Sequence, residues 1–470
     1  MKAVFSEFHA LSAFSFLRGA SQPEEMVLQA AELEIRSIAL TDHEGFYGSA
    51  RAYHAAKKSA IRVITGATLQ WDGAHVPVLC ATRKGYQALS RHLTDRHLDQ
   101  HQLLPVSGSG DLIALTGDRE GPVIRHLLRD DRDAALQAAQ ALVAAFGQRN
   151  VYVEIHRHGL RDDGKLNRCL IDLAEHLRLP LLASNAPVYA RSTDRPLADA
   201  FTCLRHHTTM DAAGQLLAPN SFRYLRGPGE MHALFKDLPQ ALRATQELDS
   251  RLGFTLEKLG YEFPNFHDDR GLPMSMEEQT AMLRWEAVEG VKRILGDCSA
   301  EDLEQIEKEV ALIHQLGFSG YFLIVQDLVR YARSQGILCQ GRGSAANSMV
   351  CYGVGITRVN AVQQKLVFER FLTRGQVAWP DIDIDFPSGD QREKVIQYVF
   401  RKYGPRGAAM TANVITYRSR SAFREMSKVL GFPPSISERF SAIGSTPATS
   451  WQDSRNKPEL SFEDRTSGIV

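Results

Sequence analysis

Three aspartates alternate with apolar residues in the run Pro380–Phe386, and this pattern suits metal chemistry. Asp381, Asp383 and Asp385 recur at every second position. Period-two alternation is typical of a β-strand, which would place all three carboxylates on one face and the apolar side chains on the other. Neighbouring Asp Cα atoms would then lie about 6.6 Å apart, which suits a pair of divalent ions about 3.5–4 Å apart. Because unneutralised like charges repel, we expect a metal site here rather than a solvated strand face.

A glycine-rich run precedes the aspartates and could bind phosphate. Gly341–Ala346 reads Gly-Arg-Gly-Ser-Ala-Ala, which is typical of a tight turn leading into a helix, and a short strand is expected just before it at Ile337–Cys339. Backbone N–H groups at such a turn can cradle phosphate oxygens, and the guanidinium of Arg342 can pair with them bidentately. Together with the aspartates, this run makes a nucleotide and two metal ions the expected ligands.

These motifs resemble the palm of C-family bacterial DNA polymerases, the family of the replicative DNA polymerase III alpha subunit. The resemblance is carried by Gly341–Ala346, Phe368–Leu372 and Pro380–Phe386. Tyr331–Gln340 and Val414–Ala422 are similar to the error-prone, damage-associated branch. The resemblance implies an α/β palm of the nucleotidyltransferase type. It also implies error-prone DNA synthesis in damage-induced mutagenesis and translesion repair, by template-directed attack of a primer 3′-hydroxyl on a deoxynucleoside triphosphate.

Individual roles follow from the same resemblance. It assigns catalysis and the binding of two Mg²⁺ ions to Asp381 and Asp383. It assigns the binding of the triphosphate to Arg342, Gly343 and Ser344 of the glycine-rich turn and to Arg370. The third acid, Asp385, is expected to contact solvent or to support the strand. Primer–template DNA and deoxynucleoside triphosphates are the expected partners.

A basic segment follows the aspartates. Between Phe386 and Leu430 there are nine Lys or Arg against three Asp or Glu, on a chain whose formal net charge is zero. Aromatic residues are interleaved with the basic ones, a composition suited to contacts with DNA phosphates or a triphosphate. A solvated helix face accounts for part of this charge. The best candidates for such contacts are Arg418, Arg420 and Arg424, which lie in the family-like motif and could share a helix face or its lead-in turn.

The first part of the chain, residues 1–265, is predicted to form a β/α barrel. Short apolar runs alternate with helical patterns such as Ala134–Phe146, and this alternation is typical of parallel βα units. The runs are Ser37–Leu40, Arg62–Thr65, Val76–Cys80, Leu112–Leu115, Val151–Ile155 and Pro180–Ala183. Polar residues such as Glu154 and His156 cluster at the ends of several runs. In a β/α barrel, that end of the strands is the functional face.

This domain resembles the PHP (polymerase and histidinol phosphatase) domain that precedes the palm in the family, but its metal-binding pattern is broken. His9, Asp42 and His43 remain. Other residue types stand at five positions where the resemblance places ligands or their supports: Leu11, Arg18, Thr68, Ala186 and Val188. Because metal binding needs several N and O ligands that converge, we expect a structural domain with no metal and no exonuclease activity. His156 and His158 are accordingly expected to be ordinary, satisfied histidines.

Composition places the chain among ordinary globular proteins. The 470 residues are enough for two or three domains, and 44% hydrophobic with 23% charged residues can bury a core. The six cysteines include no Cys-x-x-Cys pair, which argues against a zinc site or a disulfide framework. The N-terminus does not resemble a signal peptide, and no apolar run reaches membrane-spanning length. We therefore expect a cytoplasmic protein.

The predicted domains are the PHP-type barrel over 1–265, the first part of the palm over 270–430, and the start of a helical thumb with a polar tail over 431–470. Within the palm, Ser299–Asp302 resembles a capping box that would begin a helix. Family members are much longer. On the resemblance, the third catalytic aspartate, the fingers, most of the thumb and the region that binds the sliding clamp and other damage-response proteins would lie beyond Val470. We therefore expect that the chain alone binds DNA weakly and does not extend a primer.

Two other functions are compatible with the sequence. One is a metal-dependent phosphoesterase or 3′ exonuclease in the barrel, which near-stoichiometric bound metal would support. The other is a non-catalytic remnant that binds DNA or a partner protein, which primer extension would distinguish from an active polymerase.

Overall fold

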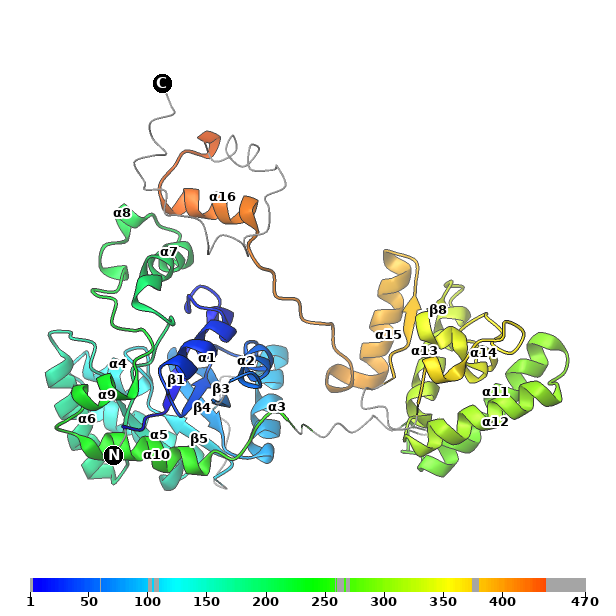
Figure 1. The fold of residues 1–470 in the computed structure, drawn as a ribbon, viewed down its shortest axis with the longest axis horizontal. Coiled ribbons are helices and arrows are strands. Elements are labelled where there is room, and N and C mark those ends of the chain that lie inside the picture. Colours follow the sequence, from blue (N-terminus) through cyan, green and yellow to red (C-terminus); the bar gives the residue numbers. More distant parts are fainter. Residues whose placement is uncertain are drawn as a thin grey trace. The chain divides into compact units, whose positions relative to one another are not determined.

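The computed structural model describes residues 3–59, 61–99, 104, 110–257, 259, 266–267, 271–373 and 380–436. The chain divides into two compact units. The first contains residues 1–259 together with 414–470, and the second contains residues 260–413. Each unit combines helices with strands (Figure 1).

One curled sheet of seven strands organises the first unit (Figure 1). Its strands are hydrogen-bonded in sequence order: β1 (Glu7–Ala10), β2 (Ser37–Leu40), β3 (Arg62–Trp71), β4 (Ala74–Cys80), β5 (Leu112–Leu115), β6 (Val151–Ile155) and β7 (Leu181–Ala183). Each predicted apolar run coincides with, lies within or overlaps one of the strands β2 to β7. The predicted α/β class and the barrel-like sheet are therefore confirmed.

The middle of the sheet differs from the prediction of parallel βα units. β1–β2–β3 and β5–β6–β7 are parallel, whereas β4 is antiparallel to both of its neighbours. Only Asp72 and Gly73 join β3 to β4, and their φ angles are 48° and 67°. Two-residue turns with positive φ at both positions are favoured in β-hairpins, and they are too short for the crossover that a parallel pair needs. The Asp-Gly pair therefore accounts for the reversal.

Most helices of the first unit pack around this sheet, whereas α7, α8 and α16 lie away from it (Figure 1). The helices of this unit are α1 (Pro23–Glu32), α2 (Ser49–Ala56), α3 (Arg83–Asp99), α4 (Pro122–Leu127), α5 (Arg132–Phe146), α6 (Asp163–Leu177), α7 (Arg195–Arg205), α8 (Met210–Ala213), α9 (Pro228–Leu234), α10 (Pro239–Arg251) and α16 (Ser419–Val429). The predicted helix over 134–146 lies within α5. Strand residues such as Phe8, Ile113 and Tyr152 form a buried layer with Leu248 of α10, so α10 completes the core on that side of the sheet.

Two segments that are far apart in the sequence meet in the first unit. Met426 and Val429 of α16 pack against Ala200 and Cys203 of α7 and against Ala213 of α8. The buried apolar side chains of α16 thus attach this late segment to the helices that follow the barrel strands. This packing explains why residues 414–436 belong to the same compact unit as the barrel.

Helices dominate the second unit. Its elements are α11 (Met276–Leu295), α12 (Ala300–Gln315), α13 (Ser319–Ser334), β8 (Gln340–Arg342), the 3₁₀ turn η5 (Gly343–Asn347), α14 (Met349–Gly353), the 3₁₀ turn η6 (Phe368–Arg370), β9 (Asp383–Asp385) and α15 (Asp390–Gly407). The predicted capping box is confirmed, because Ser299 Oγ accepts from the Asp302 N–H at 3.1 Å and Asp302 Oδ2 accepts from the Ser299 N–H at 3.3 Å. α11 and α14 cross so closely that a Cβ on Gly290 would lie 1.8 Å from the carbonyl oxygen of Gly353.

The two short strands differ in extent from the prediction. The strand predicted over 337–339 is wrong, because Ile337 is buried against Ala332 and Val395 while its backbone is not part of a strand. Pairing begins at Gln340, since β9 is the only described partner and it faces residues 340–342. The strand predicted over 380–386 is likewise limited to Asp383–Asp385, so Asp381 precedes it.

No single described helix is long and apolar enough to span a membrane. α12 and α13 reach that length and composition only when they are taken together, and they are bent by 115° at the break between them. Their apolar residues, including Ile306, Ile313 and Phe322, are buried in the core of the second unit.

The buried carboxylate of Glu309 fixes the start of α14. This side chain of α12 accepts hydrogen bonds from the backbone N–H groups of Met349 at 2.9 Å and Val350 at 3.0 Å. The Ser348 hydroxyl donates to it at 2.7 Å, and the Gln305 amide donates at 2.8 Å. Burial raises the pKa of Glu309, and these hydrogen bonds oppose the rise. The carboxylate therefore ties α12 to the helix that follows the glycine-rich turn.

Substituting Glu309→Ala should destabilise the second unit and loosen α14. The change would leave two buried backbone N–H groups unpaired, at roughly 1–3 kcal/mol for each. The matched control is Glu307→Ala on the same helix, which removes only an exposed ion pair with Arg284, worth about 0–1 kcal/mol. Native-state hydrogen exchange at Met349 and Val350 measures the difference. Equal protection of these amides in the two variants would contradict the role given to Glu309.

Candidate nucleotide site and histidine-rich cavity

The glycine-rich run and the aspartate run lie side by side as neighbouring strands. β8 and β9 pair in antiparallel fashion, with Arg342 opposite Asp383. The three aspartates of the run are exposed, whereas Ile382 and Ile384 pack against the core of the second unit. The predicted alternation is confirmed. The fold therefore brings a turn of the phosphate-binding type and a row of carboxylates to one edge of the second unit.

Arg342 contacts two of these carboxylates. Its Nε lies 3.3 Å from Oδ2 of Asp385, and its Nη2 lies 3.9 Å from Oδ2 of Asp383. All three side chains are more than half exposed, so each ion pair is worth about 0–1 kcal/mol. Because these ion pairs are weak, a divalent cation can replace Arg342 as the partner of the aspartates. A phosphate can likewise replace the aspartates as the partner of Arg342.

Glycines shape the turn between β8 and η5. The Gly341 N–H donates to the carbonyl oxygen of Ile356 at 2.7 Å, and a Cβ on Gly341 would lie 2.6 Å from that oxygen. Gly343 has a φ of 66°, a conformation that favours glycine. Ser344 lies within η5, and η6, which carries Arg370, is in contact with η5. The nucleotide candidates thus gather around one turn, although among the described residues only Arg342 forms an ion pair with the aspartates.

The aspartates do not by themselves enclose a metal ion. Within the described part of the chain, they are not a group of three whose ligand atoms all lie within 4.8 Å of one another. Their side chains are exposed and therefore open to solvent and to incoming ligands.

The three basic candidates lie in the first unit, on a different unit from the aspartates. Arg418 immediately precedes α16, while Arg420 and Arg424 lie about one helical turn apart on it, and all three are exposed. Another face of α16 packs against α7 through Met426 and Val429. α16 therefore presents a basic surface while its apolar residues hold it in place.

A cavity of about 740 Å³ lies where the strands of the first unit end, as the barrel prediction requires. Several polar side chains line it: His9, His43, His75, Asp118, His156 and His158. Leu11, Arg18, Thr68 and Val188, which occupy four of the altered ligand positions, line it too. Four of the five altered positions therefore lie together at one cavity.

Asp42 does not line this cavity, although the sequence pattern retains it. Its Oδ1 accepts hydrogen bonds from the Ser12 N–H at 2.8 Å and the Ser15 hydroxyl at 2.6 Å, and its Oδ2 accepts from the Ser12 hydroxyl at 2.8 Å. Burial raises the pKa of Asp42, and these hydrogen bonds oppose the rise. The Asp42 carboxylate therefore stabilises the turn after β1, and both of its oxygens already accept hydrogen bonds there.

In one part of the cavity wall, acidic and basic side chains of the chain neutralise each other. Arg18 donates to Glu120 Oε2 at 2.7 Å, and His75 Nδ1 lies 2.9 Å from the same oxygen. The rings of His43 and His75 lie 4.5 Å apart. Burial, together with the nearby His75 and Arg18, lowers the pKa of His43 to about 3. Glu120 thus neutralises the positive charge of Arg18, and His43 is uncharged at neutral pH.

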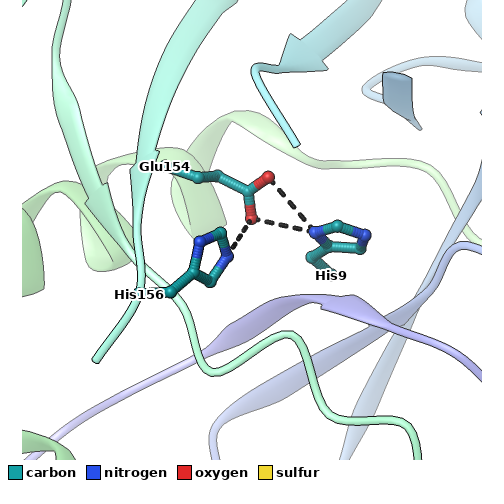
Figure 2. A group of neighbouring side chains, drawn as sticks. All are labelled: His9, Glu154 and His156. Carbon is teal, nitrogen blue, oxygen red and sulfur yellow. Dashed lines mark hydrogen bonds and ion pairs between the residues drawn. The ribbon is translucent and has the colours of Figure 1, made fainter. Parts of the chain in front are cut away.

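Three buried side chains converge at the end of β6 (Figure 2), and two of them, His9 and His156, line the cavity. His9 Nδ1 lies 3.2 Å from both carboxylate oxygens of Glu154, and His156 Nε2 lies 3.6 Å from Glu154 Oε1. The expectation that His156 is satisfied is wrong, because its buried Nε2 has no hydrogen-bond partner in the described part of the chain. His158 fits the expectation, since its Nε2 is 2.9 Å from the carbonyl oxygen of Asn185.

Sequence reasoning also missed Asp118, which lines the cavity just after β5. Its Oδ2 accepts from Arg223 Nη2 at 2.7 Å. Burial raises the pKa of Asp118, but the attraction of Arg223 and of the nearby His9 and His156 outweighs burial and holds the pKa well below its usual range. The position of Asp118 shortly after the apolar run Leu112–Leu115 could have identified it from the sequence alone.

Two family models match the chain. Residues 7–158 match the PHP domain, and residues 281–465 match the bacterial DNA polymerase III alpha NTPase domain. The error-prone DNA polymerase of Mycolicibacterium paratuberculosis is 39% identical over 97% of this chain and 43% of the relative. That of Mycobacterium bovis is 39% identical over 93% and 42%, and that of Pseudomonas aeruginosa is 40% identical over 92% and 41%. The chain therefore spans less than half the length of these curated relatives.

Proposed function

This chain belongs to the bacterial DNA polymerase III alpha family, and we propose that it serves error-prone, DNA-directed DNA synthesis in damage-induced mutagenesis and translesion repair. The observation that carries the proposal is the pairing of β8 with β9, which sets the glycine-rich turn beside the aspartates. Nucleotidyl transfer needs a phosphate-binding element and metal-binding carboxylates at one place. The reaction proposed is the attack of a primer 3′-hydroxyl on a deoxynucleoside triphosphate paired with a template.

In the proposed site, Asp381 and Asp383 hold two Mg²⁺ ions. Bound there, the ions would supply Lewis-acid stabilisation of the attacking and leaving oxygens. Asp383 lies within β9 and Asp381 just before it, and both side chains are exposed to incoming ligands. Asp385 has no catalytic role in this proposal and serves to position Arg342, which it contacts.

The triphosphate is proposed to lie against the turn that β8 and η5 form. The planar guanidinium of Arg342 suits bidentate contacts with phosphate oxygens. Gly343 has no side chain, so a phosphate can approach its backbone and that of Ser344 closely. Arg370, on the neighbouring η6, adds positive charge where the pyrophosphate leaves. Holding the substrate in this way matters because orientation can account for about 7–11 kcal/mol of a reaction barrier.

Substituting Asp383→Ala should weaken the binding of a deoxynucleoside triphosphate in the presence of Mn²⁺ by roughly tenfold or more, a loss of about 1.4 kcal/mol or more. The reason is that the metal ion would lose one of its protein ligands. Calorimetric titration of the whole chain with dATP and Mn²⁺ measures this affinity. Any primer extension by the chain should fall with it.

The matched control is Asp390→Asn, which alters another exposed carboxylate, at the start of α15. Its nucleotide affinity should equal that of the unaltered chain. If Asp383→Ala bound the nucleotide as tightly as Asp390→Asn does, the assignment of Asp383 to the metal site would be refuted.

Primer–template DNA is proposed to contact Arg418, Arg420 and Arg424. Contacts with phosphates release counterions, so the affinity should fall steeply with salt. Changing all three residues to Gln should reduce the slope of log affinity against log salt by about 0.9 for each phosphate that is no longer neutralised. Fluorescence anisotropy at several NaCl concentrations gives this slope.

The control for the DNA experiment alters three exposed basic residues elsewhere in the first unit, Lys58, Arg129 and Arg168, to Gln. Their substitution changes the net charge by the same amount and should leave the slope nearly unchanged. Equal slopes in the two triple variants would show that α16 is not the DNA contact.

The proposal also covers the role of the barrel, the cellular location and the partner proteins. We assign the barrel a structural role in place of phosphoesterase activity, because Leu11 and Val188 line the cavity where ligands were expected. A polymerase that copies bacterial DNA would work in the cytoplasm. Contacts with a sliding clamp and other damage-response proteins are proposed for the polymerase as a whole.

A further inference from the structure

Strand pairing holds only part of the aspartate segment in the second unit. β9 begins at Asp383, whose backbone pairs with Arg342 of β8. Asp381 and Ile382 precede the strand, so the register between β8 and β9 does not fix them. Carboxylates that share metal ions must be held within about 0.5 Å of their binding geometry. A different contact therefore has to set the position of Asp381 relative to Asp383.

Tyr321, near the start of α13, makes such a contact. Its hydroxyl oxygen accepts a hydrogen bond from the Ile382 N–H at 3.2 Å. This N–H belongs to the peptide group that links Asp381 to Ile382. Because a peptide group is planar, a restraint on its N–H also restrains the Cα atom of Asp381. The Tyr321 hydroxyl therefore acts on the backbone that carries one of the two metal-binding candidates.

The Tyr321 side chain is itself held by the core of the second unit. Its ring packs against that core, as the Ile382 side chain does. The ring lies edge-on to that of the fully buried Phe322, with 6.2 Å between the ring centroids. Next to Tyr321, the backbone passes so close to α11 that a Cβ on Gly320 would lie 2.2 Å from Oε1 of Gln279. The start of α13 therefore gives the hydroxyl a fixed position from which to hold the aspartate segment.

The hydroxyl of Tyr321 is uncharged beside the aspartates. Burial raises the pKa of Tyr321, and the hydrogen bond from Ile382 opposes the rise. The nearby charges of Asp381 and Asp383 add to the rise, because they disfavour a further negative charge. A neutral hydroxyl can accept the Ile382 N–H without adding to the repulsion between the carboxylates. Tyrosine thus supplies the acceptor that this position needs at no electrostatic cost to the site.

The same helix also holds the segment that follows the aspartates. Asp327 of α13 accepts hydrogen bonds from the Tyr398 hydroxyl at 2.9 Å and the Tyr403 hydroxyl at 3.1 Å, both on α15. The rings of Tyr331 and Tyr398 stack with their centroids 3.8 Å apart. α13 and α15 accordingly lie side by side (Figure 1). α13 therefore anchors the chain both before and after β9.

We propose that Tyr321 is a positioning residue for the two-metal site and acts through the backbone of Asp381 and Ile382. The role given to Tyr321 rests on the proposed function, because it concerns the same two aspartates. With the hydrogen bond in place, both carboxylates are presented to the metal ions in a fixed relation. Without it, pairing with β8 still holds Asp383, but the ions have to order the backbone of Asp381 as they bind. That ordering costs conformational entropy and lowers the affinity.

The test is Tyr321→Phe in the whole chain, which removes the hydroxyl and keeps the ring in the core. Calorimetric titration with dATP and Mn²⁺ should show an affinity about tenfold lower, the smaller end of what the loss of a supporting residue costs a metal site. Hydrogen exchange at the Ile382 amide should become faster, because the amide loses its acceptor. The matched control is Tyr331→Phe, which removes a hydroxyl from the same helix and keeps the ring that stacks on Tyr398. It should leave both measurements unchanged.

A double-mutant cycle separates positioning from a general loss of stability. In a chain with Asp381→Ala, the carboxylate that Tyr321 positions is already absent, so adding Tyr321→Phe should cost little further affinity. An equal loss in both backgrounds would show that Tyr321 acts only on the fold and would overturn the proposal. Equal exchange at Ile382, or equal nucleotide affinity, in the Tyr321 and Tyr331 variants would overturn it alone if the unaltered chain binds dATP with Mn²⁺. Absence of that binding in the unaltered chain would instead overturn the proposed nucleotide site, and this role with it.

Discussion

Satisfying buried carboxyl groups is the constraint on which both units depend. A carboxyl group taken out of water costs free energy unless hydrogen-bond donors or cations compensate for it. In the second unit, Glu309 meets this requirement with the backbone N–H groups at the start of α14. In the first unit, Glu7 of β1 accepts from the Ser184 hydroxyl at 2.7 Å and the Asn185 N–H at 2.8 Å, just after β7. Each acid therefore fixes the position of a loop that lies far from it in the sequence.

The same requirement shapes the functional faces. Glu7 links the first strand of the sheet to the segment after the last strand, and the Leu11 N–H donates to the carbonyl oxygen of Pro187 close by. These contacts position the walls of the cavity. Glu309 has the corresponding effect in the second unit, because α14 follows the turn that carries Arg342. In both units a buried acid holds a backbone in place so that neighbouring side chains can be placed for binding.

The two candidate sites differ chiefly in exposure. Asp383 and Arg342 are more than half exposed, so their partners can exchange with substrates that arrive and leave. His9, Glu154 and His156 are buried, so their charged and polar atoms interact with one another more than with water. The solvent around each group, rather than its residue type, makes this difference, because water screens and competes for exposed charges.

The sequence by itself determined the local elements. The apolar runs located β2 to β7, Ser299–Asp302 located the start of α12, and period-two alternation showed which side chains near Asp383 are exposed, because each pattern depends on residues a few positions apart. The Asp-Gly pair at 72–73 is also a local pattern, and it favours the hairpin that makes β4 antiparallel to β3. The alternation of strands and helices along the chain had instead predicted parallel units. Only the tertiary structure decided that pairing begins at Gln340, that α16 packs on α7, and that Glu154 meets His9 and His156. These outcomes depend on which distant groups share a buried space, and no local spacing in a sequence encodes how buried charges and unpaired nitrogens find each other.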